Sequence, residues 1–196
     1  MNTELLDEML EAPHLLIAGM TGSGKSVLLN QLIPRMPGQL YLIDLKKVEL
    51  WSYRRKAVWY ADEVKDAVHL LEYVLKLIDR RYRRMQRRGQ KNTAQEPVWV
   101  CIDELADLMV TCRKQVEPLL VRIGQIGRAA GVHLIMCTQQ PSAQIIPSSI
   151  KLNCERVGLR CMTAMQSRQI IEMPGAEKLP QYGWCIWQGT RREITL

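Results

Sequence analysis

Short apolar runs alternate along the chain with longer segments in which apolar residues recur every three or four positions. The runs read HLLIAG, LYLID, AVWYA, VWVCID, VHLIMCT and ERVGLR. Their length and β-branched content are typical of buried strands. Helical spacing covers four segments, at about 26–34, 62–88, 114–130 and 164–172. Repeated alternation of strand and helix predicts an α/β fold with a mostly parallel sheet and helices on both faces.

The longest helical segment ends in a concentration of positive charge. Its apolar positions from Val64 to Met85 follow the spacing of one buried face, Asp62 is its expected N-cap, and Gly89 is its expected end. Around its carboxyl end lie Arg80, Arg81, Arg83, Arg84, Arg87 and Arg88. Cations suit that end of a helix dipole, but six within nine residues exceed what capping requires. Two interpretations stay open: a solvated helix end, and a polyanion contact made by Arg84, Arg87 and Arg88.

Length and composition limit the fold and its surroundings. The 196 residues, 47% of them apolar, suffice for one core, so we expect residues 1–196 to form a single domain. The apolar runs fall far short of the roughly 20 residues that a membrane-spanning helix needs, and the acidic beginning lacks a signal-peptide layout. We therefore expect a cytoplasmic chain, with membrane association through a partner or a further segment as the alternative.

A glycine-rich stretch, GMTGSGKS, follows the first apolar run and precedes a helical segment. It satisfies the phosphate-loop pattern GxxxxGK followed by Ser or Thr, in which backbone N–H groups and a helix amino terminus surround a phosphate. Lys25 is expected to bridge the β- and γ-phosphates and Ser26 to bind Mg²⁺, so the stretch predicts ATP and Mg²⁺ as ligands. The expected nucleotide-binding residues are Gly19, Thr21, Gly22, Ser23, Gly24, Lys25 and Ser26.

A second apolar run, VWVCI, leads directly into Asp103 and Glu104. In phosphate-loop ATPases an acid in this position holds Mg²⁺, which we assign to Asp103. Glu104 is the expected general base that polarises the attacking water. Adjacent acids favour the ATPases that have an extra strand between the phosphate loop and this strand, and either LYLID or VHLIMCT is a candidate for it.

Taken together, these segments resemble the motif set of the FtsK/SpoIIIE family of DNA translocases. The similar blocks read, in order, PHLLIAGMTGSGKS, LIDLKKVEL, PVWVCIDELADLM, IGRAAGVHLIMCTQQPS and SRQIIEMPGAEKL. The resemblance extends from Pro13 to about Trp187. It implies a RecA-like phosphate-loop core that assembles into a ring, usually a hexamer. Such a ring threads double-stranded DNA through its channel at the expense of ATP.

The resemblance also implies roles for single residues. Gln139 matches the polar sensor of the γ-phosphate, and Arg128 matches the arginine finger. Lys151 and Arg168 match basic positions on loops that face DNA. Independently of the family, a helix over about 114–127 would carry Arg128 on the order of 20 Å from its own phosphate loop. Arg128 would therefore act on a neighbour's ATP, in a ring of head-to-tail subunits. The alternative is a surface arginine that pairs with a nearby acid.

Some positions depart from the family pattern. Gln140 stands where the family usually has an arginine that helps hold DNA, and Ala164 replaces a lysine. Two lost cations per subunit should weaken phosphate contacts in the channel. The arginines of residues 80–88 are candidates to compensate from another surface. Leu45 replaces a common proline, which we interpret as neutral.

The expected function is a DNA translocase for DNA transfer or segregation, with a phage, plasmid or conjugative element as a candidate context. The alternative is an ATPase of a specialised protein-secretion system, because secretion ATPases use the same core. The net charge of +7 favours DNA. A slow nucleotide-binding regulator is disfavoured by the intact Lys25, Asp103, Glu104 and Arg128.

Overall fold

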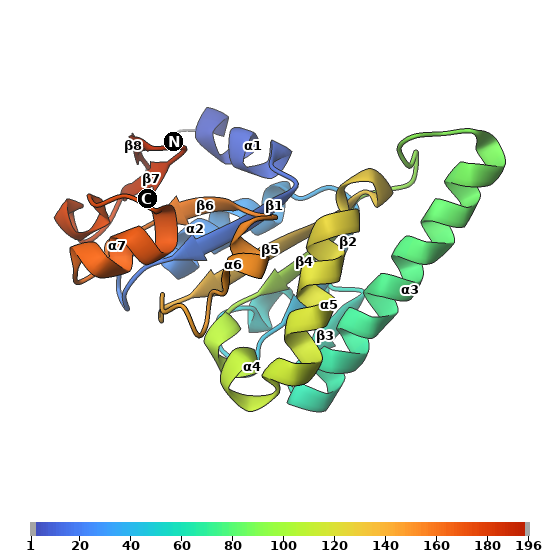
Figure 1. Cartoon of the computed structure of the whole chain (residues 1–196), viewed down its shortest axis with the longest axis horizontal. Helices are drawn as coiled ribbons and strands as arrows, with labels where there is room; N and C mark the ends of the chain where they lie inside the picture. The colour runs from blue at the N-terminus through green and yellow to red at the C-terminus, as the bar shows by residue number, and fades with distance from the viewer. Residues whose placement is uncertain (1–2, 195–196) are drawn as a thin grey trace.

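The computed structural model describes residues 3–194, which form one eight-stranded sheet with the strand order β3-β2-β4-β5-β1-β6-β7-β8 (Figure 1). The strands are β1 His14–Ala18, β2 Gln39–Ile43, β3 Trp59–Ala61, β4 Val98–Ile102, β5 Val132–Thr138, β6 Glu155–Gly158, β7 Trp184–Trp187 and β8 Thr190–Glu193. The first six in spatial order pair in parallel, and β7 and β8 extend that sheet as antiparallel strands. The mostly parallel sheet predicted from the sequence is thus confirmed.

Helices cover both faces of the sheet, as predicted (Figure 1). They are α1 Thr3–Glu11, α2 Lys25–Leu32, α3 Val64–Arg88, α4 Leu105–Thr111, α5 Arg113–Ile126, α6 Ser148–Lys151 and α7 Ala164–Ile171. Alternate strand residues divide the core in two, because successive side chains of a strand point to opposite faces. In β1, Leu16 packs with α3, α4 and α5, whereas Leu15 and Ile17 pack with α1 and α2.

The strand order settles which apolar run lies between the phosphate-loop strand and the strand that ends in acids. VHLIMCT forms β5, which pairs with β1 on one side and β4 on the other. LYLID forms β2, on the far side of β4. Among the helices and strands, α1, α4, α6 and the hairpin of β7 and β8 were not predicted.

Two predictions about α3 need correction. Its N-cap is Glu63, which makes no side-chain capping bond, whereas Asp62 pairs with Lys47 at 3.2 Å. The predicted end is confirmed, since Gly89 closes the helix at φ 61°. Arg81 does not belong with the solvent-facing arginines. It lies one turn beyond Ile78 on the buried face and is only 6% exposed, because backbone carbonyls receive its guanidinium.

No helix within residues 3–194 combines the length and the apolar character that a bilayer crossing requires.

Candidate nucleotide-binding site

The predicted phosphate loop lies at the carboxyl edge of the sheet, between the end of β1 and the start of α2. Gly24 adopts φ 92° with open space around a notional Cβ, so its backbone conformation, and not crowding, selects glycine there. At Gly19 the reason is space, since a Cβ would lie 2.6 Å from Leu159 Cβ and from Ser23 Oγ. The Ser23 hydroxyl is buried and makes no hydrogen bond within residues 3–194. An open, turned loop with an unused hydroxyl fits a phosphate ligand.

Lys25 and Asp103 form a buried ion pair at the base of the loop. The ammonium lies 3.3 Å from Asp103 Oδ1 and 3.3 Å from the Asp103 carbonyl oxygen. Burial alone would lower the pKa of Lys25, but neighbouring groups, above all Cys137 and Asp103, outweigh burial and raise it. Burial raises the pKa of Asp103, and Lys25 opposes that shift. The lysine therefore carries its charge where an anionic phosphate would need it.

The oxygen donors at this edge also fit Mg²⁺. Ser26 is half-buried in the first turn of α2, next to Lys25, and Asp103 follows β4. Mg²⁺ commonly takes one or two protein oxygens and completes its shell with phosphate and water. The donor set predicted from the sequence is therefore chemically adequate for this ion.

Glu104 is held in one orientation by groups at the end of β5. Its Oε1 accepts a hydrogen bond from Thr138 Oγ1 at 2.6 Å, and its Oε2 accepts one from the backbone N of Gln139 at 3.0 Å. Oε1 also accepts a hydrogen bond from the backbone N–H of Ala106 at 3.2 Å, so Glu104 caps the amino terminus of α4. The predicted general base is thus tied to the strand that leads to the predicted sensor.

The predicted sensor reaches the phosphate loop directly. Thr21 Oγ1 donates to Gln139 Oε1 at 2.7 Å, which connects two segments 118 residues apart. A pocket of about 180 Å³ lies beside this bond. Its walls are Met20, Thr21, Gly22, Gly24, Lys25, Ser26, Val27, Gln139 and Tyr182.

Sequence reasoning missed Thr138 and Tyr182. Thr138 lies at the end of an apolar strand, where a hydroxyl carries no signal until its neighbour is known. Tyr182 is 52% exposed and lies in the loop that leads into β7, the first strand of a hairpin that was not predicted. An exposed aromatic residue beside a nucleotide pocket is a recognisable signal, but only after folding has brought the two together.

The remaining predicted site residues lie elsewhere. Arg128 is exposed at the turn before β5, at the amino edge of the sheet, opposite the phosphate loop. Lys151 ends α6, and its Nζ lies 3.4 Å from the carbonyl oxygen of Gln169, next to the exposed Arg168 on α7. The exposed Arg84, Arg87 and Arg88 end α3. The structure thus brings the predicted ATP-site residues together and separates them from Arg128 and from the arginines of α3.

A parallel sheet with a phosphate loop after β1, paired acids after β4 and one strand between them defines the class of phosphate-loop ATPases with an inserted strand. Within that class the chain belongs to the FtsK/SpoIIIE family, whose model matches residues 2–96 and 88–143.

Similar proteins agree with this assignment. The chain is 37% identical to DNA translocase FtsK of Lactiplantibacillus plantarum over 92% of its own length and 26% of that protein. It is 36% identical to DNA translocase SpoIIIE of Bacillus subtilis over 89% of its length and 26% of that protein. The chain thus spans about a quarter of the length of these relatives.

Solved structures show the same fold. The pCW3 conjugation coupling protein TcpA, solved as a monomer with ATPγS, superposes with a TM-score of 0.83 at 27% identity, over 93% of this chain and 59% of that one. The type VII secretion ATPase EccC of Thermomonospora curvata superposes with a TM-score of 0.75 at 23% identity, over 93% of this chain and 25% of that one.

Proposed function

We propose that this FtsK/SpoIIIE-family ATPase domain moves double-stranded DNA as one subunit of a ring, most simply a hexamer. The observation that carries the proposal is the joined set of Lys25, Asp103, Glu104 and Gln139, within a chain that is 36% and 37% identical to two proteins named DNA translocases. The relatives extend well beyond the matched segment, so translocation is proposed for this domain by similarity and from its chemistry.

Each residue of the site has a role in hydrolysis. The loop amides and Ser23 would hold the β-phosphate, while Lys25 exchanges its bond to Asp103 for phosphate oxygens. Ser26 and Asp103 would hold Mg²⁺, which offsets charge on the β- and γ-phosphates. Glu104, oriented by Thr138 and Gln139, would accept a hydrogen bond from the attacking water.

DNA is favoured over protein as cargo by charge and by likeness. The chain carries a net charge of +7, and Lys151 and Arg168 lie on neighbouring helices where DNA contacts were predicted. Likeness to a conjugation coupling protein at 27% identity is consistent with DNA transfer between cells as the setting. The likeness to a secretion ATPase is below 25% identity and concerns the fold alone.

ATP turnover measured with and without a duplex of mixed sequence tests the proposal. We expect duplex DNA to raise turnover several-fold at low salt. Glu104→Gln should abolish turnover and keep ATP binding, and Lys25→Ala should abolish turnover. Glu63→Gln, an exposed acid outside the site, is the matched control and should behave as the parent.

The two halves of the proposal fail separately. Normal ATP turnover by Glu104→Gln would refute the assignment of Glu104 as the general base. Robust turnover that duplex DNA leaves unchanged at every salt concentration would refute DNA as the cargo. It would favour the alternative, an ATPase of a specialised protein-secretion system.

A further inference from the structure

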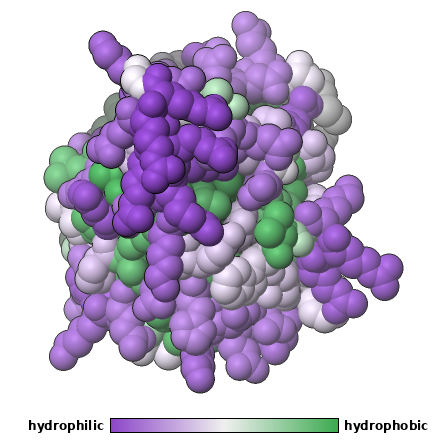
Figure 2. Space-filling view, turned by 90° about the vertical axis from the view of Figure 1, so that its right-hand side faces the viewer, coloured by the Kyte–Doolittle hydropathy of each residue, from purple (hydrophilic) through white to green (hydrophobic). Residues whose placement is uncertain are grey.

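A basic cavity of about 510 Å³ lies along the last turns of α3, far from the predicted nucleotide pocket. One wall is Gln39, the first residue of β2, which places the cavity at the amino edge of the sheet. The phosphate loop lies at the carboxyl edge. Figure 2 faces α3 and shows a dense group of strongly hydrophilic side chains on this surface. Five arginines line the cavity: Arg80, Arg81, Arg83, Arg84 and Arg87.

The cavity contains a fixed, buried cation. Arg81 donates from Nη1 to the Ala130 carbonyl at 2.7 Å and from Nη2 to the Glu96 carbonyl at 2.7 Å. Its guanidinium thereby joins α3 to the segment before β4 and to the turn before β5. Within residues 3–194 no carboxylate lies within ion-pairing distance of Arg81, so its hydrogen bonds go to backbone carbonyls and Glu96 attracts it only at longer range.

The exposed arginines of the cavity also form no ion pair with a carboxylate within the described residues, although Arg80 lies over the Tyr73 ring at 5.3 Å. Asp79 on α3 and Glu96 on the following loop are the nearest acids in sequence, and neither forms an ion pair there. Unpaired guanidinium groups that share a concave surface repel one another and raise the local positive potential. An anion that enters the cavity relieves this repulsion.

Helix geometry arranges these cations in a row. Arg80, Arg84 and Arg87 are spaced four and three residues apart and so share one face of α3. At about 1.5 Å per residue the row is about 10 Å long. The underlying turns are fixed, because the buried Ile78, Arg81 and Met85 hold them against the rest of the protein. A rigid row of this length suits an anion with several phosphates in line better than a single phosphate ion.

We propose that this cavity, together with the adjoining turns of α3, binds the sugar–phosphate backbone of double-stranded DNA at a site separate from Lys151 and Arg168. The guanidinium fork matches phosphate oxygens, and the amides of Gln39 and Gln95 add neutral donors. No aromatic side chain among residues 3–194 lines the cavity, so it offers backbone contacts without a platform for stacking single-stranded bases.

The site rests on the proposed function in that DNA is the cargo, and it adds a second point of contact. It would offset the loss of cations at Gln140 and Ala164 from the opposite edge of the sheet. Arg88, at the end of α3, lies outside the cavity walls and extends the positive field.

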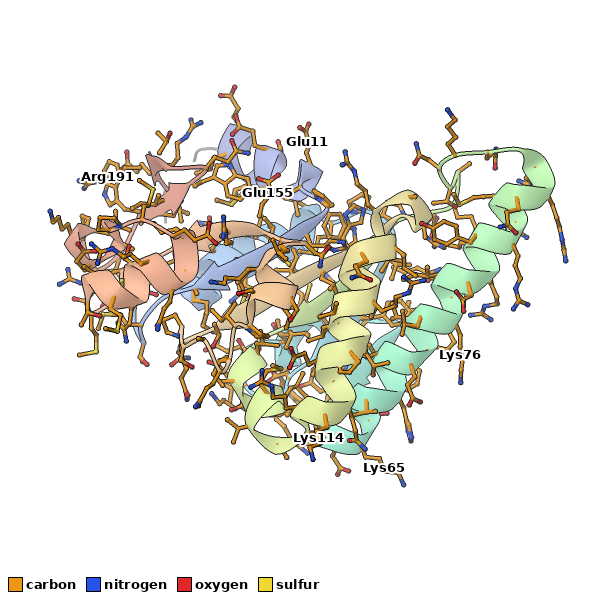
Figure 3. The ribbon with its side chains drawn as sticks, in the orientation of Figure 1. Glu11, Lys65, Lys76, Lys114, Glu155 and Arg191 are labelled. Carbon is orange, nitrogen blue, oxygen red and sulfur yellow. The ribbon has the colours of Figure 1, made fainter. Side chains whose placement is uncertain are left out.

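Salt-dependent DNA binding by two matched double variants tests the site. Arg84→Gln with Arg87→Gln removes two cations from the cavity and keeps helix propensity. Lys65→Gln with Lys114→Gln removes two exposed cations at the other end of α3 and at the start of α5, where Figure 3 shows both lysines pointing away from the body of the protein. The probe is a duplex of mixed sequence, and the affinity is followed by fluorescence anisotropy from low to moderate salt.

We expect the arginine pair to reduce the slope of log affinity against log salt by about 2, since each phosphate contact contributes about 0.9. The lysine pair should leave that slope unchanged. ATP turnover without DNA should equal that of the parent for both pairs, which also confirms their folding.

Three results would overturn the inference, and each differs from a failure of the proposed function. Equal slopes for both pairs would show that the cavity makes no DNA contact, although the parent still binds. Weaker self-association of the arginine pair with unchanged DNA binding would make the cavity a contact for an acidic surface of a neighbouring subunit. Tighter binding to single strands than to the duplex would refute the choice of ligand. Failure of the parent to bind duplex DNA would instead refute the proposed function.

Discussion

Thr138 donates a hydrogen bond from its hydroxyl to Glu104, with 2.6 Å between Oγ1 and Oε1. Both residues are buried; Thr138 is the last residue of β5 and Glu104 follows the adjacent parallel strand β4, so the bond fixes the predicted general base relative to β5. The same hydroxyl oxygen accepts a hydrogen bond from the backbone N–H of Gln140 at 3.1 Å. Thr138 is therefore a positioning residue for Glu104 and for the segment that carries the predicted sensor.

Thr138→Val should lower the turnover number roughly tenfold or more and leave the affinity for ATP nearly unchanged. The substitution preserves shape but removes the donor, so the Glu104 carboxylate keeps only backbone donors and gains rotational freedom. Steady-state kinetics together with equilibrium nucleotide binding check this. Thr138→Ser restores the hydroxyl and should recover most of the turnover. A Val variant that turns over like the parent would show that the backbone donors suffice.

Tyr182 should contribute to binding the nucleoside part of ATP. Its side chain is 52% exposed and forms part of the wall of the predicted nucleotide pocket, together with the phosphate loop and Val27. Tyr182→Ala should weaken ATP binding about 2- to 10-fold, the range expected for one aromatic contact, and Tyr182→Phe should not. Competition by inorganic triphosphate separates base from phosphate binding. An equal loss for ATP and for triphosphate would mean that Tyr182 supports the loop and does not contact the nucleoside.

The strands and the phosphate loop were predictable because their signals are local. Each parallel strand is a short apolar run, and the loop is a contiguous motif. The hairpin of β7 and β8 was missed because β8 is mostly polar and exposed. Its two-residue turn consists of Gln188 and Gly189, which both have positive φ. The glycine in this turn was the signal that the sequence offered.

Contacts between distant segments could not be predicted in this way. Thr138 lies 34 residues from Glu104, and their contact depends on β5 lying beside β4, which the apolar pattern left undecided against LYLID. Arg81 is 49 residues from Ala130, and only the fold supplies the carbonyl groups that allow an arginine to be buried. The strand order therefore determines both contacts.

His14 should make the protein less stable as the pH falls. His14 is the first residue of β1 and its imidazole is buried. Its Nδ1 accepts a hydrogen bond from the backbone N–H of Leu134 at 3.0 Å. Burial, aided by the neighbouring His133 and opposed by the Gly124 backbone, lowers the pKa of His14 to about 4. Because the unfolded chain binds this proton near pH 6.5, stability is complete above that pH and falls between about 6.5 and 4. The loss attributable to His14 is at most about 3 kcal/mol.

Urea unfolding at pH 7, 5.5 and 4.5 measures this loss. His14→Asn keeps an acceptor near the position of Nδ1 and cannot titrate, so its stability should fall less steeply with acid than that of the parent. His133, whose pKa is also lowered, chiefly by burial, is present in both proteins, so the difference between them reports His14 together with its interaction with His133. Parallel curves for the two proteins would contradict the assignment.

Arg128 cannot serve the nucleotide bound to its own subunit. It precedes β5, whereas Thr138 is the last residue of that strand and Gln139 follows it, and seven residues of strand at about 3.3 Å each separate the two edges by about 20 Å. Arg128 is exposed, and no carboxylate within residues 3–194 pairs with it, so the surface ion pair that was its alternative explanation is not formed there. If Arg128 stabilises charge during hydrolysis, it does so across a head-to-tail contact.

Mixing two inactive variants tests this directly. Lys25→Ala lacks a working phosphate loop but keeps its finger, and Arg128→Ala keeps the loop but lacks the finger. In a random one-to-one mixture about a quarter of the interfaces combine an intact loop with an intact finger, so turnover should recover to about a quarter of the parent value. Lys25→Ala mixed with Glu104→Gln is the matched control and should stay inactive, because both changes fall in the same subunit's site. The protein is expected to be monomeric when dilute, so the mixtures are measured at concentrations where mass measurement detects mixed assemblies. Absence of recovery in such assemblies would show that Arg128 does not act on a neighbour's ATP.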